Sequence, residues 1–180
     1  MLEKIFDNDK TIKRENMIYI LMMIFVLSGV LGFLYELVFY KIDLGYFTNR
    51  GTTFGPWIPV YGFGSLFLMI FCYRFRKNPL LVFILSLIIT GIVEYSTGLF
   101  CDKVLGARYW DYNTEIWNFG NINGYICFRS VFLFALSGLF LVYVLVPVVN
   151  KLFNKYNFKV LSVVLFSLFI LDIILWKIIN

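Results

Sequence analysis

The chain has 180 residues, of which 61% are hydrophobic, 21% aromatic and only 15% charged. A soluble domain is about 45–50% apolar, and one of this length could not bury so many large apolar side chains. The composition therefore indicates a membrane protein with several spans. The absence of histidine excludes Ser-His-Asp and Cys-His catalysis and removes the commonest metal ligand.

Five apolar segments follow one another along the chain, and each is predicted to cross the bilayer as a helix. The fold class is therefore all-α, a polytopic transmembrane helix bundle. The fifth segment is shorter than most of the others and carries Asp172 near its end. Three regions follow: a polar cytoplasmic head at 1–16, a four-helix membrane domain at 17–149, and a basic link with a fifth helix at 150–180. The predicted spans are residues 17–40, 57–73, 79–101, 124–149 and 160–176.

Lys and Arg residues are distributed unevenly between the two sides of this bundle. Ten fall before the first span or in the links at 74–78 and 150–159, and five fall on the other side. The positive-inside rule then places the N-terminus in the cytoplasm and the loops 41–56 and 102–123 outside. The net charge of +5 thus reflects membrane topology, and nucleic acid is not an expected partner. We expect a multi-pass protein of the plasma membrane with the lipid bilayer as its partner.

The first outer loop is rich in residues that interrupt helices. Gly55-Pro56 forces an extended approach, and Pro59 suits the first turn of the second span. Irregular backbone at membrane depth is tolerated only where protein buries it or where it lines a cavity. The loop is therefore predicted to dip back into the bundle, with Trp57 and Tyr61 as interfacial anchors.

Besides Asp172, three charged residues lie inside the predicted spans, Glu36, Glu94 and Arg129, and a charge costs about 2.5–3.5 kcal/mol at the helix centre. At 1.5 Å per residue, Glu36 lies roughly 28 Å above residue 17, Glu94 roughly 22 Å above residue 79, and Arg129 roughly 8 Å below residue 124. All three therefore fall in the outer half of the bilayer and are predicted to converge. A structural salt bridge and a polar cavity that binds a substrate both remain open, and Arg50 is a candidate partner for the second carboxylate.

The second outer loop, residues 102–123, combines aromatic residues with Asn and Gly. Arg108 and Asp111 are placed to form a salt bridge that pins it, while Tyr109, Trp110 and Tyr112 suit the interface belt. The loop is predicted to descend into the fourth span as a lid and to deliver Arg129 toward the two glutamates.

Motifs for a nucleotide, a metal or a disulfide are weak in this chain. No G-x-x-x-x-G-K-[ST] loop is present, so we expect no ATP hydrolysis by this chain. Cys72, Cys101 and Cys127 show no C-x-x-C spacing, and free thiols are more usual than a Cys101–Cys127 disulfide. Neither a cofactor nor a metal is expected, and whether the protein is an enzyme is left open.

Four motifs carry a family resemblance: "NRGTTFGPWIPVYGFG" at 49–64, "EY" at 94–95, "GARYWDY" at 106–112 and "NINGYICFR" at 121–129. In this order, and with the Tyr35-Glu36 pair, they resemble the bacterial ABC-transporter type IV (permease-like) integral membrane proteins over residues 20–145. The resemblance implies a transport component that works with a separate ATPase or as a homo-oligomer. The candidate ligand-binding or polar cluster then comprises Glu36, Asn49, Arg50, Glu94, Tyr95, Arg108, Asp111, Asn123 and Arg129.

Three functions remain open from the sequence. The first is a permease-like transport component with its polar cluster in the outer half of the bilayer. The second is a small membrane enzyme that acts at the outer leaflet on a lipid or envelope precursor, since paired carboxyls can perform acid–base work and arginines bind phosphate or carboxylate. The third is a non-catalytic structural or regulatory subunit of a membrane complex.

Overall fold

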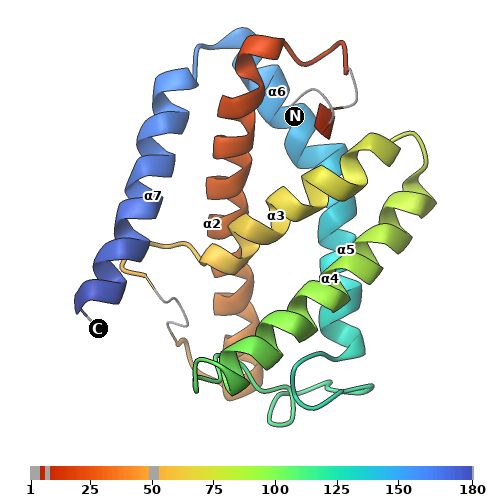
Figure 1. Cartoon of the computed structure of the whole chain (residues 1–180), viewed down its shortest axis with the longest axis vertical. Coiled ribbons are helices and arrows are strands. Elements are labelled where there is room, and N and C mark those ends of the chain that lie inside the picture. The colour runs from red at the N-terminus through yellow and green to blue at the C-terminus, as the bar shows by residue number, and fades with distance from the viewer. Residues whose placement is uncertain (1–4, 7–8, 49–52, 180) are drawn as a thin grey trace. The chain divides into compact units, whose positions relative to one another are not determined.

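The computed structural model describes residues 5–6, 9–48 and 53–179. These residues form helices and loops, and their only bridge is an isolated antiparallel pair between Ile122 and Ile126. The predicted all-helical fold is confirmed. The elements in chain order (Figure 1) are η1 Arg14–Asn16, α2 Met17–Leu44, α3 Pro59–Cys72, η2 Tyr73–Phe75, α4 Pro79–Lys103, α5 Phe128–Phe140, the π-helical turn η3 Leu141–Leu145, α6 Val146–Lys155 and α7 Lys159–Ile179.

Four helices in the described part of the chain are long and apolar enough to cross a membrane: Arg14–Leu44, Pro79–Lys103, Phe128–Lys155 and Lys159–Ile179. The predicted fifth span is therefore confirmed as a helix of this kind. The predicted span at 57–73 is the exception, because it corresponds to a shorter apolar helix, Pro59–Phe75. That segment extends about 25 Å at 1.5 Å per residue, less than a hydrocarbon core of about 30 Å.

The chain divides into two compact units. Unit 1 contains Met1–Arg74 and Leu141–Asn180, and unit 2 contains Phe75–Phe140. The chain passes between them twice, once within the 3-10 turn η2 and once where α5 gives way to the π-helical turn η3. Both crossings therefore lie where the backbone departs from regular α-helix, a feature that often marks hinges or functional sites.

Helix α2 is the centre of unit 1 and packs against α3, α6 and α7. Phe25 of α2 is fully buried, with its ring 5.0 Å from Phe169 of α7 and 5.3 Å from Phe166. Small residues make the close approaches possible, as expected for membrane helices. A Cβ on Gly29 would lie 2.6 Å from the Phe169 ring, and one on Gly62 would lie 2.9 Å from Phe25.

The chain before α3 enters the middle of unit 1, which confirms the predicted re-entrant loop for its described residues. The amide of Ile58 donates to the Gly29 carbonyl at 3.0 Å, near the midpoint of α2. Thr53 is buried, and its hydroxyl donates to the Trp57 carbonyl at 2.7 Å. This depth explains why α3 is short: the loop has already covered part of the membrane thickness before Pro59 starts the helix.

The aromatic residues of this loop are half-buried against the helices of unit 1, and their role as interfacial anchors stays a prediction. The Trp57 ring stacks on Phe169 at 4.8 Å and 17°, and its indole Nε1 donates to Asp172 of α7 at 2.7 Å. Tyr61 lies against Gly32 of α2. A ring placed inside a helix bundle gains more contact than one at the interface, and here glycines supply the space.

The polar head folds against the helix ends of unit 1. Phe6 is fully buried, with its ring 5.5 Å from Tyr73 in an edge contact. The Tyr73 hydroxyl donates to Asp9 at 2.8 Å, and the Asn150 amide of α6 donates to the Thr11 carbonyl at 3.0 Å. These contacts bring the head, the end of α3 and α6 together at one end of the unit.

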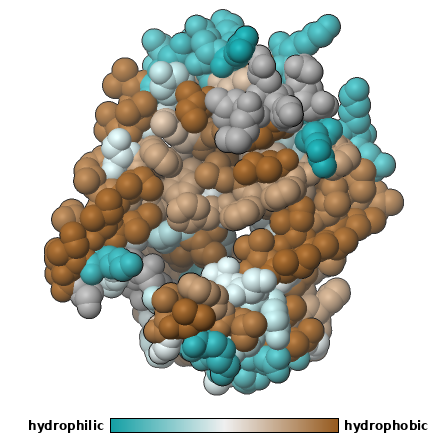
Figure 2. Space-filling view, in the orientation of Figure 1, coloured by the Kyte–Doolittle hydropathy of each residue, from teal (hydrophilic) through white to brown (hydrophobic). Residues whose placement is uncertain are grey.

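Unit 2 is a helical hairpin in which α4 and α5 pack together and the lid loop, residues 104–127, connects their ends (Figure 1). The small and polar face of α4 turns inward: Ser86 is fully buried, and Gly98 is buried against Trp110 and Tyr125. Figure 2 shows hydrophobic residues over the helix surfaces and hydrophilic residues gathered toward the helix ends and loops. Such surfaces match lipid-facing helices.

Candidate functional site: a polar clasp beneath the lid loop

Turn chemistry shapes the lid loop. Gly106, Gly120 and Gly124 all have positive φ, a conformation that glycine adopts without steric cost. The Asp111 carboxylate accepts from the amide of Asn113 at 2.9 Å, the Asx-turn pattern that Asp favours. At Gly124 any Cβ would meet the side chains of Asp111 and Asn113. The loop is therefore a folded structure with its own polar centre.

Glu94 attaches the lid loop to α4. The Tyr112 hydroxyl donates to Glu94 Oε1 at 2.5 Å, and Ser130 Oγ at the start of α5 lies 3.0 Å from Glu94 Oε2. Tyr112 and Ser130 are buried, and Glu94 is partly buried. One carboxylate thus joins three parts of unit 2: helix α4, the lid loop and helix α5.

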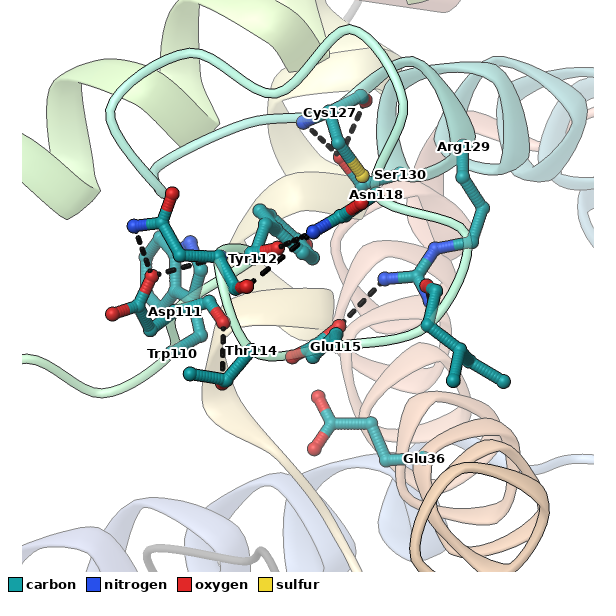
Figure 3. A network of polar contacts seen from close by, with 12 residues as sticks. Glu36, Trp110, Asp111, Tyr112, Thr114, Glu115, Asn118, Cys127, Arg129 and Ser130 are labelled. Carbon is teal, nitrogen blue, oxygen red and sulfur yellow. Dashed lines mark hydrogen bonds and ion pairs between the residues drawn. The ribbon is translucent and has the colours of Figure 1, made fainter.

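Arg129 attaches the lid loop to α5 (Figure 3). Its Nη2 donates to Glu115 Oε2 at 2.6 Å, and its Nη1 donates to the Ile116 carbonyl at 3.0 Å. The two charged side chains are only 9% and 7% exposed. A charge-assisted pair of this kind, buried away from water, is among the stronger polar contacts a protein makes.

The two attachments are in contact with each other through Tyr112. The guanidinium carbon of Arg129 lies 5.4 Å from the centre of the Tyr112 ring, within the range of a cation–π contact. Burial, together with the adjacent Glu94 carboxylate, raises the pKa of Tyr112 well above its ordinary value, so the phenol is a hydrogen-bond donor at neutral pH. We call Glu94, Tyr112, Ser130, Arg129 and Glu115 the lid clasp.

Other predicted site residues stabilise the lid loop itself. The predicted Arg108–Asp111 salt bridge is confirmed, with Nη1 and Oδ2 3.3 Å apart. Arg108 also donates to the Asn123 carbonyl, and the Asn123 amide lies 3.2 Å from the Tyr95 hydroxyl of α4. These four residues therefore form a second, more exposed group beside the clasp.

The remaining predicted residues do not belong to unit 2. Glu36 lies on α2 in unit 1, where its carboxylate accepts from the Tyr61 hydroxyl at 3.1 Å. Its convergence with Glu94 and Arg129 stays a prediction. Asn49 and Arg50 lie outside the described residues.

Four residues outside the predicted cluster prove important. Tyr112 was expected at the membrane interface but is buried against Glu94. Glu115 is the ion-pair partner of Arg129, and Ser130 adjoins the same cluster. In unit 1 the Asp172 carboxylate accepts from the amides of Phe54 and Gly55 at 3.0 and 2.7 Å, and from the Trp57 indole. The signal in the sequence is the charge itself, because a carboxylate in an apolar helix requires hydrogen-bond donors.

The chemistry available in the clasp is that of hydrogen bonding and charge. Two carboxylates, one guanidinium, one phenol and one hydroxyl can exchange partners or hold an anionic or polar ligand. Among the described residues, no group of three or more Cys, Asp and Glu side chains could hold a metal ion. Cys72, Cys101 and Cys127 are buried, and Cys101 and Cys127 are not joined by a disulfide.

Comparison with known proteins gives one match. The family described as "Putative ABC-transporter type IV" matches residues 23–176. The match extends beyond the four spans that carry the sequence motifs and includes most of α7, so the fifth helix belongs to the family pattern. No curated protein and no solved structure matches the chain significantly. With four helices able to cross a bilayer, the chain is a multi-pass membrane protein related to transport, and it belongs to the ABC-transporter type IV family.

Proposed function

We propose that this protein is a permease-like transport component in which the lid clasp acts as a gate at the outer end of α4 and α5. One observation carries the proposal: the buried groups of a single short loop segment, Tyr112 and Glu115, are held by charged side chains of two different spanning helices. A loop fastened only for stability could be packed with apolar residues, because replacing a buried ion pair by hydrophobic groups is often neutral or stabilising.

A gate needs contacts that can be broken and made again. The clasp contacts are polar and directional, and a ligand with a carboxylate, a phosphate or several hydroxyls offers Arg129 and Tyr112 replacement partners. The lid can then open without leaving charges buried and unpaired, which would otherwise cost several kcal/mol, on the order of 3–5. A ligand of this class would lower the barrier to opening by its differential affinity for the open lid.

The orientation we propose has the head in the cytoplasm of a bacterial cell and the lid loop outside the cell membrane. Basic residues support this arrangement in unit 1, since the head, η2, α6 and the start of α7 carry most of its cations. Asn150 and Tyr73 bind the head directly, so these cations gather at one end. That end matches the cytoplasmic side under the positive-inside rule.

Energy for transport would come from a separate ATPase subunit. The family is one of ABC transporters, whereas this chain lacks a G-x-x-x-x-G-K-[ST] phosphate loop. A homo-oligomer would supply the additional helices that a pathway through so few spans requires.

The proposal is tested by native mass spectrometry of the protein purified in mild detergent from its own host. We compare the wild type with Glu94→Gln and with a control, Ser137→Ala, whose hydroxyl donates to the Leu133 carbonyl of the same helix at 2.9 Å. The proposal expects a polar small molecule that the wild type and the control retain and Glu94→Gln loses. Identical retention by all three folded proteins would contradict a ligand-binding role for the clasp.

A further inference from the structure

The end of the lid loop exposes large apolar side chains. We define the lid tip as residues 117–122, which contain Trp117, Phe119 and Ile122 at 58%, 59% and 50% exposure. Single exposed apolar residues are common on proteins, but three within six residues form a patch that marks an interaction surface.

The polar side chains of the lid tip turn the other way. The Asn118 amide donates to the Tyr112 carbonyl at 2.9 Å, and the Asn121 amide donates to Asn113 Oδ1 at 2.7 Å. In a loop that faces water, asparagine amides have no need of internal partners. Here both amides donate hydrogen bonds within the lid loop, while the aromatic rings face outward.

Part of the backbone of the lid tip is satisfied from within the loop. Asn121 donates its N–H to Asn118 at 3.1 Å, Ile122 to Ile126 at 2.9 Å, and the amide of Phe128 to the Phe119 carbonyl at 3.1 Å. The backbone groups without an internal bond need water, so the segment suits the hydrated headgroup boundary and not the hydrocarbon core.

Aromatic rings continue from the lid tip down the exposed face of α5. Phe119 lies 5.9 Å from Phe128, and Phe128 stacks on Phe132 at 5.7 Å and 22°. Phe128 and Phe132 are themselves exposed on a helix apolar enough to span the membrane. The lid tip is thus continuous with the exposed apolar surface of a helix that is able to span the membrane.

Charge is absent where the apolar patch lies. Residues 116–128 contain no Asp, Glu, Lys or Arg. The charges that precede them are engaged, Arg108 with Asp111 and Glu115 with Arg129. Insertion of the lid tip therefore moves no charged group out of water.

Trp117 supplies an independent argument. Its φ is +53°, which is unusual for a bulky residue and costs on the order of 1–3 kcal/mol. The strained backbone turns the indole outward instead of into the protein. Indole rings concentrate at the boundary between headgroups and acyl chains.

From these observations we propose that the lid tip inserts into the bilayer leaflet at the lid end of α4 and α5, with its aromatic side chains at the headgroup–acyl boundary. The lid loop is then an interfacial element that is anchored in lipid beside the clasp. This inference rests on the membrane location of the protein and is independent of the proposed gate.

The test places a fluorophore on the lid tip of the full chain in vesicles of phosphatidylcholine and phosphatidylglycerol. Phe119→Cys and Ile122→Cys are labelled with an environment-sensitive nitrobenzoxadiazole probe, and Lys103→Cys serves as the control, because the Lys103 side chain is 68% exposed at the end of α4. The native thiols are buried and leave the introduced cysteine as the reactive site. Each labelled protein must first show the same unfolding transition as the wild type, so that only folded proteins are compared.

Brominated phospholipid is expected to reduce emission at positions 119 and 122 more than at 103, and iodide in the buffer is expected to act in the opposite order. Two variants keep the result interpretable if one side chain proves necessary for folding. Equal iodide quenching at all three positions, without lipid quenching, would place the lid tip in water and overturn the proposal. Shielding from both quenchers that grows with protein density would assign the surface to a second copy and overturn it as well.

Discussion

Removing both members of the buried Arg129–Glu115 pair should destabilise unit 2 by less than the sum of the two single removals. Arg129→Met loses the 2.6 Å ion pair and the 3.0 Å bond to the Ile116 carbonyl, and it leaves the Glu115 carboxylate buried. Breaking such a pair costs about 3–5 kcal/mol. Glu115→Leu leaves the bond to the Ile116 carbonyl intact, so its cost should fall near the lower end of that range. The double variant should cost about 2–3 kcal/mol less than the sum of the singles.

The free energies come from equilibrium unfolding in mixed detergent micelles, followed by circular dichroism. Ser137→Ala on the same helix is the control, and its free energy of unfolding should stay within about 0.5 kcal/mol of the wild type. If the two single effects add within about 0.5 kcal/mol, the side chains are not coupled, and the clasp as described here is wrong.

Three further substitutions test other parts of the structure in the same unfolding assay. Asp172→Asn exchanges one of the carboxylate's two acceptor oxygens for a donor that faces backbone N–H groups, so it should cost about 1–3 kcal/mol of stability. The control Glu15→Gln, at an exposed position, should cost less than about 1 kcal/mol. Equal effects would contradict the role of Asp172. Gly29→Ala would place a Cβ 2.6 Å from the Phe169 ring and should cost about 1–3 kcal/mol. Gly64→Ala meets nothing within 4 Å and should be neutral or stabilise by up to about 1 kcal/mol; the reverse order would refute the packing of α2 on α7. Tyr112→Phe removes a donor from the α4 carboxylate and should cost about 1–3 kcal/mol, and an unchanged stability would show that this hydrogen bond contributes nothing.

The sequence predicts those features of the fold that depend only on residues close together in the chain. Apolar length predicts the four spanning helices, and Gly55-Pro56 with Pro59 predicts the re-entrant loop. Arg108 and Asp111 are three positions apart, so a single turn brings them together. Their salt bridge could therefore be predicted without the rest of the fold. Each of these features depends on local chemistry.

Partners that are distant in sequence were not predictable in the same way. Asp172 accepts from the amides of Phe54 and Gly55, which lie more than a hundred positions earlier in the chain. In the sequence alone it is only a charge that makes the fifth span less apolar. Arg129 was expected to converge with Glu36 and Glu94, and within unit 2 it does share the clasp with Glu94 through Tyr112. Its ion-pair partner in the lid loop, Glu115, was not predicted. Hydropathy counts Glu115 as a solvent-exposed loop residue, and only the folded path of the loop brings it beneath the lid.

Trp57 and Tyr61 show a second kind of contact that the sequence does not predict. Aromatic residues near a span end are commonly interfacial, and here the Tyr61 ring also packs on Gly32 of α2, while the Trp57 ring packs on Gly55 of its own loop and on Phe169. The signal was present in Gly29 and Gly32, since small residues on one helix face require a large partner on another. Which ring packs on that face depends on how deeply the re-entrant loop enters the unit, and only the structure shows this depth.

The central claim, that the clasp holds the lid closed, is tested most directly by the reactivity of Cys127. This native thiol lies at the base of the lid loop, is 1% exposed, and can be followed by mass spectrometry after treatment with a membrane-impermeant maleimide. We predict slow modification in the wild type and in Ser137→Ala, and fast modification in Arg129→Met and Tyr112→Phe. If Cys127 reacts at the same rate in all four folded proteins, the clasp does not control access beneath the lid, and the account is contradicted.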